Sequence, residues 1–171
     1  AASNGNKGGV AFCDFDGDQD FDLFWTDFPT DVNQIWRNNG GTNGAVTWTA
    51  MGTLPTSTSD VNGVSCGDLD HDGDVDLMLN VAGGPVGDYL FRNDGGFTFV
   101  NVSPASFGPS PSPAGAIADY DRDGDLDAYQ TNYNTPLPNK LYRNDAGTYV
   151  SMTVGDVGSI VGGSAAGLAN N

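Results

Sequence analysis

The sequence contains no glutamate, although its formal net charge is −16. All 22 acidic residues are aspartates, and only six lysines and arginines balance them. Such a chain would repel phosphates and has no basic cluster to neutralise them, which excludes nucleic acid as a partner. Aspartate favours turns and oxygen-ligand cages over helices, so its excess predicts metal-binding loops.

Long apolar segments and catalytic side chains are also scarce. No apolar run approaches the roughly 20 residues of a membrane-spanning helix, so no membrane span is expected. The single histidine, His71, lies at a variable position of an acidic loop. No thiol with a histidine partner and no phosphate-binding glycine loop is present, so we expect no catalytic residues and no enzyme.

Only two cysteines occur, Cys13 and Cys66, one and two residues before the first aspartate of their loops. Because side chains alternate between the two faces of a strand, this difference in parity predicts that they point to opposite sides. A disulfide is therefore not expected, and both are interpreted as small buried apolar side chains.

Glycine and proline, by contrast, are plentiful, at 25 and nine residues. Spread among threonine, valine and aromatic residues, they predict an all-β fold of short strands joined by turns. Three segments resemble one another: VAFCDFDGDQDFDLFW, VSCGDLDHDGDVDLML and AIADYDRDGDLDAYQT. Each is followed at nearly the same offset by IWRNNGG, LFRNDGG or LYRNDAG, which indicates a structural repeat.

We assign the repeats to residues 1–54, 55–106 and 107–157, with 158–171 as the entry strand of an incomplete fourth. The first repeat is expected to contain four strands, and turn residues are expected from Asn38 to Gly44. Four strands per unit of about 50 residues are typical of a β-propeller blade. Three blades do not ordinarily close a ring, so we expect either part of a longer chain or a ring completed by a homo-oligomer, a dimer being favoured. The four strands are predicted at Gly9 to Cys13, Phe21 to Thr26, Gln34 to Asn38 and Val46 to Met51.

Each repeat has aspartate at every second position of a nine-residue loop. A chain that curls around a cation can direct carboxylates inward from positions one, three, five and nine, and a backbone carbonyl from position seven. An EF-hand is excluded, because Trp25, Leu79 and Gln130 occupy the place of its twelfth-position glutamate. We predict one Ca²⁺ per loop, three per chain, in preference to Mg²⁺. The predicted metal-binding residues are Asp14, Asp16, Asp18, Asp20, Asp22, Asp68, Asp70, Asp72, Asp74, Asp76, Asp119, Asp121, Asp123, Asp125 and Asp127.

The sixth position of the loops differs between repeats. Gly73 and Gly124 suit the sharp turn expected there, whereas the first loop has Gln19, with Gly17 at the fourth position. A left-handed conformation costs glutamine about 1 kcal/mol, so the first loop is predicted to bind its ion most weakly.

An aspartate loop between two strands, followed by an LYRN-type strand and a glycine-rich turn, resembles the FG-GAP/VCBS repeats of integrin-α-type β-propellers. The resemblance covers all three repeats and implies that the loop aspartates are calcium ligands. Members of that family include adhesion receptors, lectins and noncatalytic parts of secreted bacterial enzymes. The resemblance therefore implies a secreted or cell-surface protein and leaves the ligand open.

The segments between the second and third strands of each repeat are candidates for a ligand site, because propeller loops gather on one rim. They combine flat aromatic faces with amide and carboxylate groups, which suits a sugar. We expect a carbohydrate-binding module; the alternatives are a structural or adhesion segment that binds extracellular protein and, less favoured, part of a polysaccharide-degrading enzyme. Packing of Trp25 and Tyr133 between blades competes with the sugar-site interpretation. The candidate residues are Trp25, Asp27, Phe28, Asn80, Tyr133 and Asn134.

Overall fold

The computed structural model describes residues 8–27, 32–42, 44–56, 61–82, 86–109, 111–132 and 138–152. Within these ranges the chain forms twelve strands and one short 3₁₀ helix, which confirms the all-β prediction. None of the described helical segments is long and apolar enough to cross a membrane.

The strands form three four-stranded antiparallel sheets, here called blades 1, 2 and 3, each with its strands in chain order. Blade 1 contains β1 (Val10–Cys13), β2 (Asp22–Asp27), β3 (Val32–Thr42) and β4 (Ala45–Gly52). Blade 2 contains β5 (Val61–Gly67), β6 (Asp76–Val81), β7 (Tyr89–Asn93) and β8 (Phe99–Asn101). The helix η1 (Ala105–Phe107) precedes blade 3, which contains β9 (Ala114–Ala118), β10 (Asp127–Thr131), β11 (Lys140–Asp145) and β12 (Thr148–Ser151).

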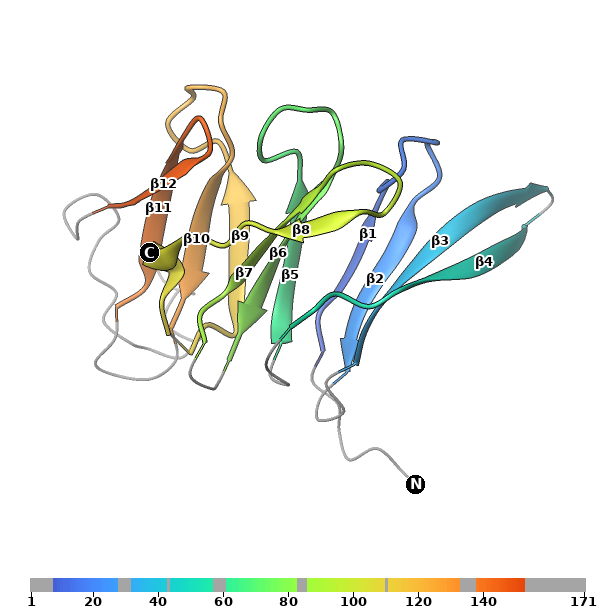
Figure 1. Cartoon of the computed structure of the whole chain (residues 1–171), viewed down its shortest axis with the longest axis horizontal. Helices are drawn as coiled ribbons and strands as arrows, with labels where there is room; N and C mark the ends of the chain where they lie inside the picture. The colour runs from blue at the N-terminus through green and yellow to red at the C-terminus, as the bar shows by residue number, and fades with distance from the viewer. Residues whose placement is uncertain are drawn as a thin grey trace, which may run out of the picture.

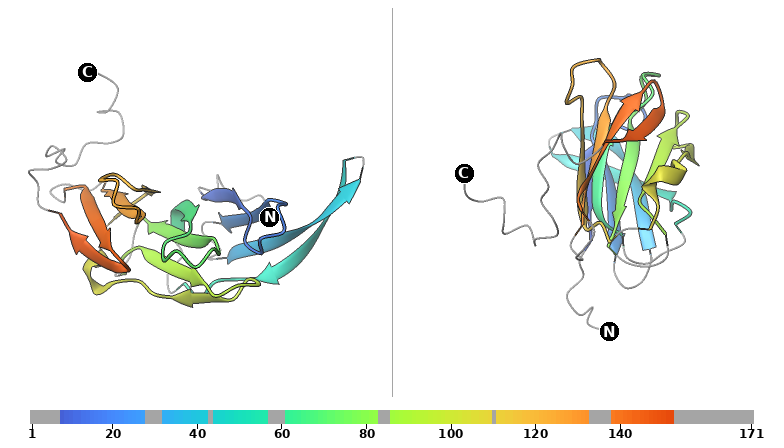
Figure 2. Two further views of the ribbon diagram at one scale, coloured as in Figure 1. Left: turned by 90° about the horizontal axis from the view of Figure 1, so that it is seen from above. Right: turned by 90° about the vertical axis from the view of Figure 1, so that its left-hand side faces the viewer.

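The blades stand side by side (Figure 1) and follow an open arc when seen from above (Figure 2). The first strands of neighbouring blades contact each other, β1 with β5 and β5 with β9. This arrangement is compatible with the predicted propeller blades, and the described residues do not close a ring. Each blade falls within one predicted repeat, whereas the predicted entry strand in 158–171 lies outside the described residues.

Strand β3 is longer than predicted, because it continues to Thr42 through residues that we assigned to a turn. The pairing with β4 shifts in register between Asn38 and Gly41, so a bulge absorbs the extra residues. A side chain at Gly41 would collide with the backbone of Ala45. Gly41 therefore allows close approach of the two strands.

Each interface between blades has its own apolar core. The core between blades 1 and 2 includes Phe15, Phe24 and Leu77, and the core between blades 2 and 3 includes Met78 and Tyr142. Every residue of β6 is buried, because this strand has a neighbour on both faces. In β2, by contrast, buried and half-buried residues alternate, since the described residues cover blade 1 on one face only.

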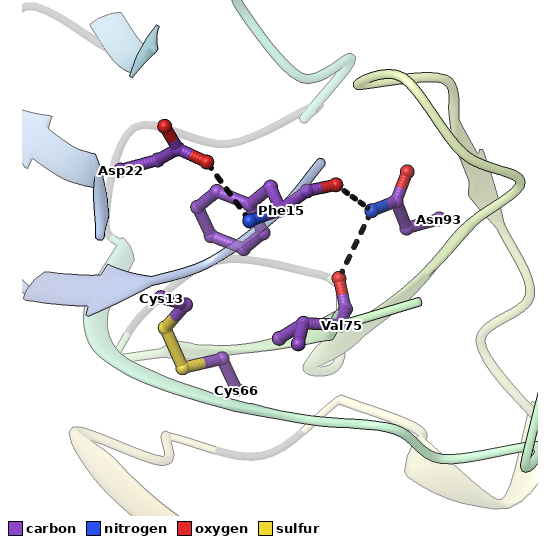
Figure 3. The surroundings of a disulfide bond; sticks show 6 residues. All are labelled: Cys13, Phe15, Asp22, Cys66, Val75 and Asn93. Carbon is purple, nitrogen blue, oxygen red and sulfur yellow. Dashed lines mark hydrogen bonds between the residues drawn. A yellow bond between two sulfur atoms is a disulfide. The ribbon is translucent and has the colours of Figure 1, made fainter. Parts of the chain in front are cut away.

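Cys13 and Cys66 form a disulfide between β1 and β5, with their Cα atoms 6.7 Å apart, so the prediction of two free thiols is wrong (Figure 3). Opposite parity would separate the two side chains if both residues lay in one sheet. They lie instead on neighbouring blades, whose facing surfaces are opposite faces of the repeat. Opposite parity is therefore what brings the two side chains together.

Candidate metal loops

The three aspartate loops connect the first and second strands of their blades and lie along the same edge of the molecule (Figure 1). Each loop is closed by a strand pair that ends at its ninth residue. The paired residues are Cys13 with Asp22, Gly67 with Asp76, and Ala118 with Asp127. The repeat of the sequence thus becomes a repeat of loop geometry.

Two residues of every loop adopt a left-handed conformation, at positions four and six. Gln19 does so with φ of 73°. His71 and Arg122, which occupy position four of the other loops, are also left-handed, at 63° and 67°, whereas the first loop has Gly17 there. Each loop therefore contains one strained non-glycine residue, so backbone strain does not single out the first loop.

The ninth-position aspartates are almost completely buried and link each loop to the third strand of its blade. One oxygen of Asp76 accepts a hydrogen bond from the Leu69 N–H at 2.7 Å, and the other accepts one from the Asn93 N–H at 2.8 Å. Asp22 and Asp127 accept the equivalent pairs. Burial raises the pKa of Asp76 to about 6 and that of Asp22 above its usual value, so a nearby cation would favour the charged forms.

Three carboxylates converge in each loop, with ligand oxygens within 4.8 Å of one another. The oxygens Asp16 Oδ1 and Asp68 Oδ1 are buried and accept no hydrogen bond from any described residue. Buried carboxylate oxygens without a partner are costly, and hard oxygen donors are the ligands of Ca²⁺, so the donor set fits this ion. The converging residues are Asp14, Asp16 and Asp18; Asp68, Asp70 and Asp76; and Asp119, Asp121 and Asp127.

The seventh-position carboxylates are not among these clusters. Asp125 Oδ2 accepts a hydrogen bond from the Ala146 N–H at 2.8 Å, in the turn between β11 and β12. Asp20 and Asp74 likewise approach the equivalent Gly40 and Gly95, where an added Cβ would lie 2.7 and 3.2 Å from their Oδ2 atoms. These side chains face the neighbouring turn, which leaves the backbone carbonyl as the group that position seven can offer an ion.

Residues 4–79 match the family model of the FG-GAP-like repeat. This part of the chain is similar to that family. The match extends over blade 1 and into β6 of blade 2, and it confirms the predicted resemblance there. Blade 3 follows the same strand order as blades 1 and 2, and its loop has left-handed residues at the same two positions. No curated protein matches the chain.

Of the predicted sugar-binding side chains, only those of Trp25 and Asn80 lie in the described part of the chain. Trp25 is half-buried near the end of β2, whereas Asn80 is fully buried and donates a hydrogen bond to Asp88 Oδ2 at 2.6 Å. Asn80 is therefore not exposed to a ligand. Phe28, Tyr133 and Asn134, together with the side chain of Asp27, lie outside the described residues.

The sequence analysis did not identify a role for the asparagine that follows the arginine in the third strand of each repeat, although the Arg-Asn pair is visible in all three. Asn93 Nδ2 donates to the Phe15 carbonyl of blade 1 at 2.8 Å and to the Val75 carbonyl of its own loop at 3.2 Å (Figure 3). Asn144 makes the same two contacts, to Leu69 of blade 2 and Leu126 of its own loop. These amides join the metal loops of neighbouring blades.

Proposed function

We propose that the chain is a calcium-binding repeat module with one ion in each loop. The observation that carries this proposal is the convergence of three carboxylates per loop, with a buried carboxylate oxygen that lacks a described partner in each of the first two loops. The FG-GAP-like match supports it, since repeats of this family often bind calcium. The match also supports a noncatalytic role, because the family is a repeat module.

Calorimetric titration with Ca²⁺ tests this function, with Mg²⁺ as the competing ion. We expect binding at three loops and a higher melting temperature in calcium, because an ion bound only by the native state stabilises it. A melting curve that excess chelator leaves unchanged, together with no heat of binding, would refute the proposal. Asp70→Asn should remove one site and leave the other two, which separates the loops from general charge effects.

The setting that we propose is secreted or cell-surface. The disulfide between Cys13 and Cys66 supports an oxidising compartment, where such bonds persist. Calcium sites in extracellular modules have dissociation constants of about 10⁻⁴ to 10⁻³ M, which suits a compartment where calcium is abundant.

For the ligand we propose carbohydrate, with the aromatic Trp25 as its described contact. Glycan-array binding that chelator abolishes would support this ligand. Binding to protein alone would favour the adhesion alternative.

We further propose a homo-oligomer in which a second copy covers the outer face of blade 1. Phe21 and Trp48 on that blade are 65% and 40% exposed. Trp48 pairs with the asparagine of the Arg-Asn segment in blade 1, and Phe99 and Tyr149 are its equivalents in blades 2 and 3. Both equivalents pack against the preceding blade. Blade 3 presents the complementary element, because Tyr120, 43% exposed, occupies the loop position of the buried Phe15 and Leu69.

The chain thus presents both halves of an interface between blades, which suits head-to-tail association. Sedimentation in millimolar calcium should show a dimer or a larger species. Trp48→Lys should shift it to the monomer without lowering calcium affinity, whereas a wild-type chain that sediments only as a monomer would contradict the oligomer.

A further inference from the structure

Each blade has an arginine in its third strand, beside its own metal loop. The arginine of blade 1 pairs with different carboxylates from the arginines of blades 2 and 3. Arg143 Nε and Nη2 lie 2.7 and 2.8 Å from the two carboxylate oxygens of Asp145. Arg92 Nε lies 2.6 Å from Asp94 Oδ1 and 3.8 Å from Asp70 of its metal loop. In blades 2 and 3 an aspartate two residues along the strand therefore binds the guanidinium.

Blade 1 has Asn39 in place of that aspartate. The Asn39 amide turns toward β4, where Nδ2 donates to the Thr47 carbonyl at 3.1 Å and to Thr49 Oγ1 at 3.0 Å. Asn39 is neutral, and its amide oxygen accepts a hydrogen bond from the Thr49 hydroxyl. It consequently offers Arg37 no carboxylate.

Arg37 instead pairs with the metal loop of its own blade. Its Nε forms an ion pair with Asp16 Oδ2 at 2.7 Å, in a geometry that does not meet the angles of a hydrogen bond. Its Nη2 donates a hydrogen bond to Asp18 Oδ2 at 3.1 Å. Asp16 and Asp18 are two of the three carboxylates that converge in this loop. A guanidinium there neutralises charge that a cation would otherwise neutralise.

We propose that Arg37 is an internal counter-ion that weakens cation binding by the first loop, and that Asn39 is the residue that permits it. Asp94 and Asp145 relieve the other two loops of the same competition. This inference rests on the proposed calcium function and names what makes the three sites unequal. It replaces backbone strain at Gln19 as the reason for a weak first site.

Terbium luminescence tests the first loop selectively, because all three tryptophans, Trp25, Trp36 and Trp48, lie in blade 1. Tb³⁺ replaces Ca²⁺, and excitation absorbed by tryptophan and not by tyrosine reports the ion nearest these residues. We expect Arg37→Met and Asn39→Asp each to tighten Tb³⁺ binding by about fivefold, which is the change in affinity expected from losing an exposed ion pair. Added salt should narrow the difference.

Two comparisons separate the proposed competition from a general effect of charge. In the Arg37→Met background, Asn39→Asp should add nothing, because it acts through the arginine. Asp94→Asn should weaken the second loop, which calorimetry with Ca²⁺ measures. Without metal, Arg37→Met should melt at a lower temperature than wild type, since Asp16 and Asp18 lose their counter-ion, yet gain more from added calcium.

Equal tightening by Asn39→Asp with and without Arg37, or no tightening by either single variant, would overturn the inference. The calcium function would stand in both cases, since the loops would still bind. Absence of Tb³⁺ and Ca²⁺ binding in wild type and variants would overturn both the inference and the function on which it rests.

Discussion

Asp88 shows at the scale of one residue how burial changes the chemistry of a carboxylate. It is 3% exposed and accepts hydrogen bonds from the Val81 N–H and the Asn80 amide. Burial raises its pKa to about 6, whereas aspartate in an unfolded chain has a pKa of about 3.9. The equivalent position in blade 3 is Asn139, which accepts the same type of backbone bond, from Asn132.

Because the folded-state pKa of Asp88 is raised, its contribution to stability is present below about pH 4 and is lost as pH rises through about 6. Asp88→Asn should therefore be more stable than wild type at pH 7, by up to about 2 kcal/mol, and similar to it near pH 4. Urea unfolding at both pH values, with saturating calcium, measures the difference; equal stability of the two proteins at pH 7 would contradict it.

Gln19 and Gly17 provide a second test at the residue scale, because both are left-handed in the same loop. Gln19→Gly should stabilise the fold by about 1 kcal/mol, since glycine adopts this conformation without strain. Gly17→Ala should destabilise it by a similar amount. Thermal unfolding of the two variants measures these opposite shifts, and shifts of the same sign would show that backbone strain does not govern this loop.

At the scale of the strand, the Arg-Asn segment joins one blade to the next. Asn93→Ala removes the donor to the Phe15 carbonyl, in a buried bond, and to the Val75 carbonyl, in a half-buried bond. We expect a loss of about 2 to 3 kcal/mol, because unsatisfied buried groups bear the full cost of desolvation. Urea unfolding monitored by circular dichroism measures this loss.

Asn38→Ala is the matched control for that prediction. The Asn38 amide donates to Phe21 of its own loop, and no bond to another blade occurs among the described residues. The bond is exposed, so its loss should cost less than about 1 kcal/mol. Equal losses for the two variants would mean that the contact between blades contributes nothing.

At the scale of the whole molecule, the disulfide joins blades 1 and 2 across a sequence separation of 53 residues. In the chain-entropy description, closing a loop of this length stabilises the folded state by about 4 kcal/mol. Reductant should therefore lower the melting temperature of the wild-type chain. The double variant Cys13→Ala, Cys66→Ala should melt near the reduced protein and be insensitive to reductant; identical wild-type curves with and without reductant would refute a stabilising role.

Features that repeat along the chain were predictable from sequence, because they depend on local spacing. Alternating aspartates bounded by strand-like residues predicted the loops. Four strands per repeat followed from the turn residues between apolar segments. The FG-GAP-like match over residues 4–79 confirms the family to which these local patterns point.

Features that depend on the neighbouring blade were decided by the tertiary structure alone. The disulfide was misjudged because strand parity has meaning only once the facing sides of two blades are known. The burial of Asn80 and the clamp made by Asn93 likewise require an adjacent sheet. The pairing of Arg37 with the first loop depends on which carboxylate its side chain can reach. Only the folded protein brings the guanidinium and the carboxylate of Asp16 close together. Spacing along the chain thus determined each blade, and contact between blades determined the rest.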